Sequence, residues 1–474
     1  MFQSFNLIAL LFFLPVIISI ILILFRSRLL NVLALFFYSC MFLIIIIRLY
    51  IYPQSYTSYF QADSLNIFFL LILGIVFFCV ALYNIHYLLR SKASLKQQTI
   101  YTILFIFFIL SMTAAFLSQH LGLLWVFIEA TTLMSAPLIN FEKSRSSLEA
   151  TWKYIFICSI GISLAFVGII LLSISTGEHH SLFFNDLYKN AGSFSLFWLK
   201  LSFPFIIIGF GTKMGLAPVH AWLPDAHSEA PSPVSAMLSG TLLNAALFSV
   251  LKINKILRLA SLYSYSNSLF FIMGFLSVFV STVFILKAHN YKRMLAYSSI
   301  ENMGIIMIGL ALGGAGAFAA FLHILAHSFS KVLLFLTSGN ILHLFKTKEI
   351  HKVNGLLKRD RLTGWLWILG FIFIAGFPPG PVFISELLMV KAFLLKKFYL
   401  AVVILIFLLT VIIYGLAKAV FNMSFGQDSL QSFSVKVSLL DYLPQIILII
   451  LLFVIGCFMP DVIYKLIQNC LMYI

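Results

Sequence analysis

The chain has 474 residues, of which 62% are hydrophobic and 10% are charged, and its 31 Lys and Arg against 15 Asp and Glu give a net charge of +16. This composition lies outside the range of soluble globular proteins and indicates an integral membrane protein. In a soluble protein the positive charge would suggest nucleic acid binding, but the excess of basic residues in the loops on one side of a membrane explains it more simply.

Apolar runs long enough to span a bilayer as a helix, roughly 20 residues, follow one another along the whole chain. We predict about fourteen spans, at 5–25, 29–51, 64–89, 100–118, 121–140, 153–175, 196–218, 233–256, 268–287, 293–312, 316–343, 364–393, 398–422 and 442–463. The first run has no basic segment before it and no small-residue cleavage site, so we expect a retained helix and not a removed signal peptide. The longest polar connections, near 176–195 and 424–441, leave no room for a soluble catalytic domain.

Basic residues gather in alternate connections, which predicts that these connections face the cytoplasm and that both termini lie outside. The five clusters on this face are Arg26 and Arg28; Arg90, Lys92 and Lys96; Lys143 and Arg145; Lys287, Lys292 and Arg293; and Lys346, Lys348, Lys352, Lys358, Arg359 and Arg361. Lys252, Lys255 and Arg258 are the exception, because the same count of spans places them on the outer face.

The cysteines and the glycines give no sign of a cofactor site. The five cysteines are far apart and form no CxxC pair, which argues against an iron–sulfur cluster, a zinc site or a disulfide framework. The glycine-rich segment GGAGAF, 313–318, lacks the spacing of a Rossmann or phosphate-binding loop. We therefore expect no cofactor, no metal, and no redox or hydrolytic centre in this chain.

Three ionisable residues in the first half of the chain lie within a predicted span or at its edge. A charged side chain at the centre of a bilayer costs about 2.5–3.5 kcal/mol on insertion scales, so a residue retained there is a functional candidate. Glu129 lies near the middle of its span; we favour a functional carboxylate over a protonated carboxyl bonded to a neighbouring helix. Lys153 lies at a helix start, where snorkelling to the interface explains it as well as a function does. Lys213 lies deep in its span and is the stronger candidate.

His323, His327 and Lys331 recur every four residues, which places them on one stripe of a helix. Two histidines at this spacing are compatible with a metal site, but no third ligand of the HExxH kind is present nearby. A pair of structural histidines with satisfied hydrogen bonds is a second alternative. We favour the third, a proton relay along the stripe.

Two spans carry helix breakers beside an ionisable residue. GTKMGLAP, 211–218, surrounds Lys213 with glycines and a proline, and GFPPGP, 376–381, places three prolines before Glu386. Interrupted helices are tolerated in a membrane where protein or water satisfies the freed backbone groups, and a pair of them points to a transport site.

The two interruptions fall in about the seventh and the twelfth span, and this odd offset of five spans means that the second copy is inverted across the membrane. Lys153 in the sixth span then corresponds to Lys331 in the eleventh. Lys213 in the seventh span corresponds to Glu386 in the twelfth. The two copies thus carry ionisable residues on the same two helices.

With these motifs in place, the chain resembles the antiporter-like membrane subunits of respiratory complex I, of Mrp-type sodium/proton antiporters and of group 4 hydrogenases. The segments that carry the resemblance are WVFIEATTL (125–133), GTKMGLAPVHAWLPDAHSEAPSPVSAML (211–238), YKRMLAYSSIENMG (291–304), HILAHSFSKVLLFL (323–336) and GFPPGPVFISELL (376–388). Within this family, EATTL and AHSEAPSPVSAMLSG are most similar to hydrogenase-4 component F.

The resemblance implies an all-α polytopic protein of about fourteen helices in a bacterial inner membrane, with two inverted five-helix repeats and two discontinuous helices. The implied organisation is about three helices over 1–99, a first repeat over 100–260, an inverted repeat over 261–423 and a C-terminal helix over 424–474. The implied partners are other membrane subunits and a peripheral cytoplasmic protein or arm.

The resemblance also implies which residues form the proton relay. By motif position they are Glu129, Lys153, Lys213, His323, His327, Lys331 and Glu386. Many relatives carry a further lysine in the eighth span, where this chain has Asn244. An asparagine can hold water but carries no proton charge, so we expect Asn244 to be only a water or relay contact.

In the expected mechanism, movement of Glu129 toward or away from Lys213 gates proton passage through the histidines to Lys331, with Glu386 as the exchange point on the opposite side. Each proton moved against 100 mV needs about 2.3 kcal/mol, which must come from outside this chain. We therefore expect the proton-translocating subunit of a hydrogenase- or complex I-like assembly. The alternatives are an Mrp-type sodium/proton antiporter subunit, a membrane partner of an inorganic-carbon uptake system, and a structural anchor with an inactive channel.

Overall fold

The computed structural model describes residues 6–52, 55–177, 181–426 and 436–474. Across these residues, 13 helices are long and apolar enough to cross a membrane, and the twelfth predicted span, 364–393, is present as two shorter helices. The prediction of an all-α, multi-pass membrane protein is therefore confirmed. Residue 5 of the first predicted span, residues 178–180 of the first long connection and residues 427–435 of the second lie outside the described residues.

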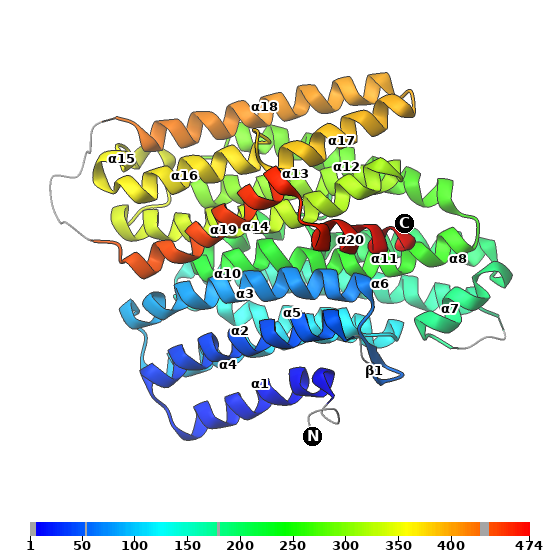
Figure 1. Cartoon of the computed structure of the whole chain (residues 1–474), viewed down its shortest axis with the longest axis horizontal. Helices are drawn as coiled ribbons and strands as arrows, with labels where there is room; N and C mark the ends of the chain where they lie inside the picture. Colours follow the sequence, from blue (N-terminus) through cyan, green and yellow to red (C-terminus); the bar gives the residue numbers. More distant parts are fainter. Residues whose placement is uncertain (1–5, 53–54, 178–180, 427–435) are drawn as a thin grey trace. The chain divides into compact units, whose positions relative to one another are not determined.

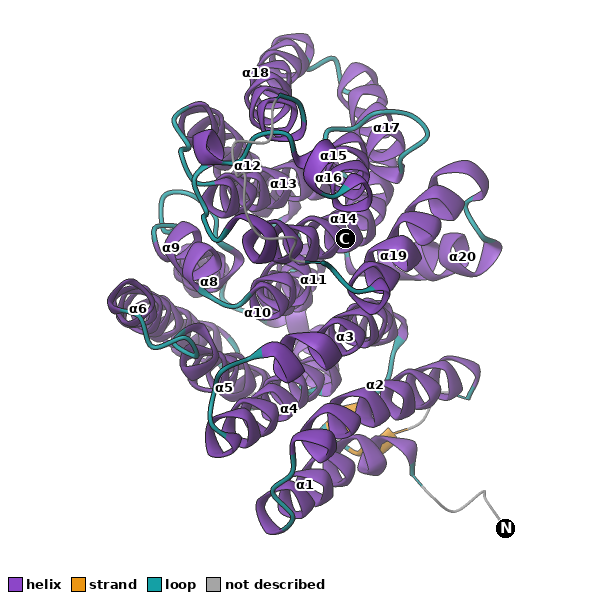
Figure 2. Ribbon diagram, turned by 90° about the vertical axis from the view of Figure 1, so that its left-hand side faces the viewer, coloured by secondary structure: helices purple, strands orange, loops and turns teal. Residues whose placement is uncertain are grey.

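The chain divides into two compact units, each of which has its own core. Unit 1 comprises Met1–Met214, Thr241–Leu269 and Met472–Ile474. Its helices are α1 Leu7–Leu24, α2 Arg28–Ile51, α3 Ser64–Arg90, α4 Leu95–Leu117, α5 Leu121–Ile139, α6 Arg145–Ser175, α7 Phe184–Asn190, α8 Leu196–Met214 and α11 Leu243–Leu259, with 3₁₀ turns at Ala191–Ser193 and Leu471–Tyr473. A short antiparallel hairpin, β1 Ser55–Thr57 with β2 Phe60–Gln61, lies in the connection between α2 and α3. Figure 2 shows α1 and α2 side by side in this unit.

Within unit 1, α6 and α8 pack along most of their length because small residues line the contact. A Cβ atom at Gly161 would collide with Thr212, one at Gly168 with Ile206, and one at Gly209 with Ala165. This close approach brings the last turn of α8 against the middle of α6, where the candidate site of the unit lies.

Unit 2 comprises Gly215–Gly240 and Phe270–Leu471. Its helices are α9 Trp222–Glu229, α10 Ser232–Met237, most of α12 Tyr263–Leu286, α13 Tyr291–Leu312, α14 Ala315–Phe345, α15 Leu356–Arg359, α16 Arg361–Ile374, α17 Pro381–Leu395, α18 Tyr399–Ser424, α19 Leu439–Phe458 and α20 Asp461–Cys470, with a 3₁₀ turn at Ile350–Lys352. The buried helix α14 is central to the unit, since it packs against α10, α13, α16, α17 and α19. Figure 1 shows α18 running beside α16 and α17.

Both predicted interruptions are present. α8 ends at Met214 and the next helix, α9, begins at Trp222, while α16 ends at Ile374 and α17 begins at Pro381. Gly215 and Gly376, with φ of +73° and +67°, take the left-handed conformation that favours glycine at a helix end. The predicted span 233–256 contains a further irregularity that the sequence analysis did not anticipate, a π-helical turn at Leu238–Leu242 between α10 and α11. Such turns are frequent at functional sites.

Candidate functional site

In unit 1, Lys213 is fully buried and its ammonium group is hydrogen-bonded. The Nζ atom donates to the hydroxyl oxygen of Tyr154 at 2.9 Å, and this oxygen lies 2.7 Å from Oγ of Ser135. Ser135 donates to the backbone carbonyl of Thr131 at 2.6 Å, so its Oγ is free to accept from Tyr154. In this arrangement Lys213 donates to Tyr154 and Tyr154 donates to Ser135 on α5, which suits a charged lysine.

The position of Lys213 in the last turn of α8 adds to this stabilisation. The unpaired carbonyl groups at a helix C-terminus carry partial negative charge, which favours a cation there. The ammonium group also lies 4.9 Å from the centre of the Tyr154 ring. The helix break predicted beside Lys213 thus contributes directly to holding its charge.

Glu129 lies on α5 and is partly exposed at the surface of the chain. Its carboxylate accepts hydrogen bonds from Ser159 at 2.8 Å and from Thr132 at 3.3 Å. It also interacts electrostatically with Lys213. Tyr154, and not Glu129, is the residue whose side chain is hydrogen-bonded to the lysine.

Lys153 lies on the exposed side of α6. Its side chain is 46% exposed and forms an ion pair with Glu149 at 2.7 Å, one turn earlier on α6. Because α6 begins at Arg145 and not near residue 153, Lys153 lies in its third turn, and the rotation of the helix points the next residue, Tyr154, inward.

In unit 2, Lys331 is fully buried on α14 and donates to the backbone carbonyl of Leu295 on α13 at 2.8 Å. It interacts electrostatically with Glu301, a buried carboxylate near the middle of α13 that the sequence analysis did not select. Glu301 accepts hydrogen bonds from Ser298 at 3.1 Å and from the Asn302 amide at 3.4 Å. Its mid-span position alone would have identified it by the criterion that selected Glu129.

His323 joins α13 to α17. Its Nε2 lies 3.0 Å from Oδ1 of Asn302, and its Nδ1 lies 2.8 Å from Oγ of Ser385, the residue before Glu386. The Asn302 amide nitrogen donates to the carbonyl of Ser298 at 2.7 Å, so its oxygen faces the ring and Nε2 must donate. Ser385 is also 2.7 Å from the carbonyl of Val382. If its hydroxyl donates there, Nδ1 donates as well and the ring is charged; if the hydroxyl turns to Nδ1, the ring is neutral.

His327 and His227 have no such partners, although both are fully buried. Neither ring nitrogen of either residue makes a hydrogen bond of ordinary geometry within the described part of the chain, although the Ser239 carbonyl lies near His327. Both histidines interact electrostatically with Lys331. Buried polar atoms of this kind are normally satisfied by ordered water, which would extend the polar path around the lysine.

Glu386 lies on α17, one turn after the second interruption, and is partly exposed at the surface of the chain. Its carboxylate lies against the bare Cα of Gly376, where a Cβ atom would overlap it. It interacts electrostatically with Glu301. The glycine of the interruption therefore makes room for the carboxylate as well as for the turn.

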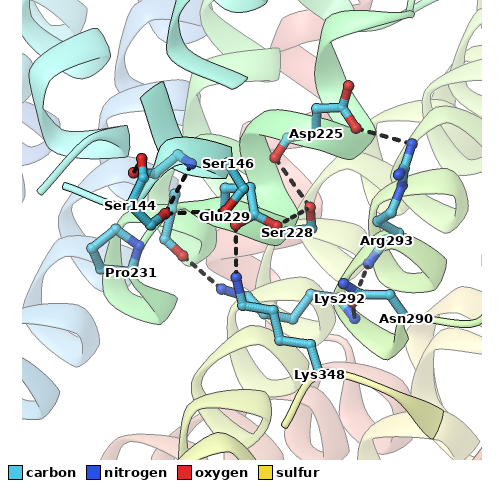
Figure 3. A network of polar contacts seen from close by, with 12 residues as sticks. Ser144, Ser146, Asp225, Ser228, Glu229, Pro231, Asn290, Lys292, Arg293 and Lys348 are labelled. Atoms are coloured by element: carbon cyan, nitrogen blue, oxygen red, sulfur yellow. Dashed lines mark hydrogen bonds and ion pairs between the residues drawn. The ribbon is translucent and has the colours of Figure 1, made fainter. Parts of the chain in front are cut away.

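A polar network fixes α9 against the start of α13 and the connection after α14 (Figure 3). Asp225 pairs with Arg293 at 2.9 Å, and Glu229 pairs with Lys348 at 3.0 Å. The buried Lys292 donates to the Ala230 carbonyl, at the C-terminal cap of α9, at 2.6 Å. Three residues of the predicted cytoplasmic clusters thus hold the short helix that follows the first interruption.

Other predicted features are placed as follows. Asn244 is buried on α11. Lys252, which the span count assigned to the outer face, is buried in unit 1 and paired with Asp63 at 2.8 Å. No group of three or more His, Cys, Asp or Glu side chains suited to a metal ion occurs among the described residues.

Comparisons with known proteins bear on this site. A sequence model of the family described as NADH:quinone oxidoreductase/Mrp antiporter, TM, matches residues 118–413. The hydrogenase-4 component F homolog of Methylacidiphilum infernorum (isolate V4) is 35% identical over 423 residues, which cover 87% of this chain and 88% of that protein.

Two solved structures share the fold. A chain of the membrane-bound sulfane sulfur reductase (MBS), an archaeal respiratory membrane complex, aligns with a TM-score of 0.87 at 24% identity, over 98% of this chain and 97% of that chain. A chain of the Mrp complex from Dietzia sp. DQ12-45-1b aligns with a TM-score of 0.87 at 16% identity, over 98% of this chain and 96% of that chain.

Proposed function

Because the chain belongs to the NADH:quinone oxidoreductase/Mrp antiporter family of membrane subunits, we propose that it moves protons across the membrane as part of a hydrogenase- or complex I-like assembly. The observation that carries the proposal is the buried ammonium group of Lys213, which is hydrogen-bonded to Tyr154 and interacts electrostatically with Glu129 on α5. A buried lysine with a nearby carboxylate changes its protonation state when that carboxylate moves or is neutralised.

The relay that we propose has partly exposed carboxylates and buried bases. Glu129 in unit 1 and Glu386 in unit 2 are partly exposed residues, and we propose that each exchanges a proton with groups or water outside the buried core. Lys213, Lys331 and the histidines of α14 are buried between helices and receive protons only from other groups or from water. We place Lys153 outside this core, because it pairs with Glu149 on the exposed face of α6.

His323 supports proton passage in unit 2 by its two-sided hydrogen bonding. A proton that arrives at the ring charges it, and the Ser385 hydroxyl then donates to Val382; when the proton leaves, the hydroxyl returns to Nδ1. His227 and His327 provide buried ring nitrogens that water is able to bridge. We propose that other membrane subunits and a cytoplasmic arm supply the driving energy, and that the protein lies in a bacterial inner membrane with both termini outside.

The test uses the assembly purified through an affinity tag on this chain and reconstituted into liposomes that contain a pH-sensitive dye. We expect Lys213→Ala and Lys331→Ala to abolish proton movement without loss of assembly. The matched control is Lys352→Ala, which removes an exposed lysine of unit 2 that pairs with Glu349. Proton movement by Lys213→Ala at the wild-type rate would exclude the relay.

The same measurement with and without sodium tests the alternative of an Mrp-type antiporter, which the family description includes. Proton movement that requires a sodium gradient, and that drives sodium in return, would assign the chain to sodium/proton exchange. Proton movement that is unchanged in sodium-free buffer supports the proton-only relay. Neither outcome depends on which redox or carbon-uptake protein is the partner.

A further inference from the structure

Glu301 is a carboxylate in the interior of unit 2 that the relay as predicted from sequence leaves out. It lies near the middle of α13 with 4% of its surface exposed. An ionisable side chain at that depth is expensive to retain unless it is paired or functional. On the premise of the proposed function, we infer that Glu301 is a proton-carrying residue of the relay, placed between Lys331 and Glu386.

The contacts of Glu301 fix its position toward Lys331. Lys331 is held against α13 by its hydrogen bond to the Leu295 carbonyl, 2.8 Å from Nζ. Ser298 and Asn302 donate to one oxygen of the Glu301 carboxylate, at 3.1 and 3.4 Å. The carboxylate is therefore oriented by its own helix, and Lys331 provides the neutralising charge from α14.

The contacts on the other side of Glu301 lead to Glu386. Asn302, the next residue, orients the ring of His323, and the same ring lies 2.8 Å from Ser385, the residue before Glu386. Lys331 on α14 and Glu386 on α17 are titratable groups that interact with Glu301. Glu301 thus stands between a lysine that stabilises its charge and a second carboxylate that opposes it when both are ionised.

Charge balance then dictates how the proton is shared. When Lys331 is charged, one ionised carboxylate of Glu301 and Glu386 balances its charge, and the other carboxyl group holds a proton. When Glu301 takes a proton from Glu386, an O–H bond forms at Glu301 and one breaks at Glu386, and the negative charge moves to the partly exposed side. When Glu301 takes a proton from Lys331, an N–H bond breaks and a neutral acid and amine remain. Glu301 is the group common to both transfers.

The repeat offset agrees with this placement. Glu129 lies in the fifth span and Glu301 in the tenth, the same offset of five that relates the two interruptions. Both carboxylates precede, in chain order, the buried lysine with which they interact. The carboxylate of unit 1 therefore has a counterpart in unit 2, whereas the lysines with which the two carboxylates interact lie in the seventh and the eleventh span, which the offset of five does not relate.

The decisive variant is Glu301→Gln, which keeps the shape of the side chain and removes its proton chemistry, with Glu301→Asp as the variant that keeps the carboxylate. In the reconstituted assembly we expect Glu301→Gln to slow proton movement at least tenfold and Glu301→Asp to retain more of it. Glu349→Gln, on an exposed connection of the same unit, is the matched control and should move protons as the wild type does. Wild-type transport by Glu301→Gln would overturn the inference.

Infrared difference spectra of the purified assembly between pH values test the same point without transport. We expect Glu301→Gln to remove one titrating carboxyl band and to make the band of Glu386, identified with Glu386→Gln, titrate at lower pH, because the repulsion by the Glu301 charge is removed. An unchanged Glu386 band would contradict the shared charge. If the wild type moves no protons but the bands change as described, the proposed function fails while the coupling of Glu301 stands.

Discussion

The ammonium nitrogen of Lys213 lies 2.9 Å from the hydroxyl oxygen of Tyr154, and both side chains are fully buried in unit 1. Two residues that are 59 positions apart in the sequence meet because glycines let α6 and α8 approach closely. Tyr154 in turn is held by Ser135 on the helix that carries Glu129. The tyrosine is thus the physical link between the lysine and the helix of the carboxylate.

Tyr154→Phe removes this link with almost no change in volume. A hydrogen bond to a charged group contributes about 1.5–3 kcal/mol. Its loss should therefore lower the ratio of charged to neutral Lys213 by about tenfold or more. We expect proton movement in liposomes to slow by a similar factor and its pH dependence to shift, with assembly intact. Tyr414→Phe, an exposed tyrosine on α18, is the control. Equal rates for the two variants would show that Tyr154 only fills space.

Lys153→Ala tests whether Lys153 takes part in the proton relay, as its motif position implies, or lies outside it, as its exposed ion pair with Glu149 indicates. The Lys153 and Glu149 side chains are 46% and 66% exposed, and exposed pairs of this spacing contribute only about 0.3–0.5 kcal/mol. We therefore expect the variant to move protons within about twofold of the wild type, whereas Lys213→Ala abolishes movement. Initial rates of dye response on the two variants make the comparison. Complete loss in Lys153→Ala would return this lysine to the relay.

The interruptions were predictable because their cause is local. Glycine at a left-handed position and proline within an apolar run mark a helix end without knowledge of the rest of the chain, and both breaks fall where these residues lie. Lys213 and Glu386 were identified for the same reason.

The inward face of each helix was not predictable in this way. Apolar residues occur on every side of α6, so its sequence contains little periodicity that distinguishes the inward side, with Tyr154, from the outward side, with Lys153. An error of a few residues at the predicted helix start then changes which of the two is expected to point inward. The set of Asn302, His323 and Ser385 comes from three helices, and only their packing shows that the three side chains meet. Glu301 was visible as a mid-span carboxylate, but no glycine or proline drew attention to it.

Ser385→Ala tests the hydroxyl that faces His323. Without it, Nδ1 loses its partner at 2.8 Å, and neither the charged nor the neutral ring is satisfied on that side. A neutral hydrogen bond contributes about 1 kcal/mol, so we expect proton movement to slow by roughly fivefold, with Ser385→Cys intermediate. Ser338→Ala, which removes a buried hydroxyl on α14 that donates to the carbonyl of Phe335, should leave the rate unchanged. A Ser385→Ala rate equal to that of Ser338→Ala would remove Ser385 from the proposed path.

Asp63 offers a test of stability that is independent of transport. It caps α3 and accepts hydrogen bonds at one oxygen from Lys252 and from the Tyr473 hydroxyl, each at 2.8 Å. Burial opposes the charge of Asp63, but the Lys252 ammonium and the hydrogen bonds outweigh it and hold the pKa of this carboxyl below its usual range. Because the pKa of the folded state is depressed, the stabilisation is present at neutral pH and is lost as the pH falls through that value.

Asp63→Asn keeps the helix cap, since asparagine caps as well as aspartate, and removes only the charge. It leaves Lys252, whose side chain is 0% exposed, without its counter-charge; this costs about 3–5 kcal/mol when both partners are buried and less here, because the Asp63 side chain is 31% exposed. We expect a clear fall in the unfolding temperature of the purified protein at neutral pH, and a difference from the wild type that shrinks as the pH approaches the folded pKa of Asp63. Lys252→Met in the Asp63→Asn background should recover part of the loss. An unfolding temperature of Asp63→Asn equal to that of the wild type at neutral pH would show that the pair contributes nothing to the fold of unit 1.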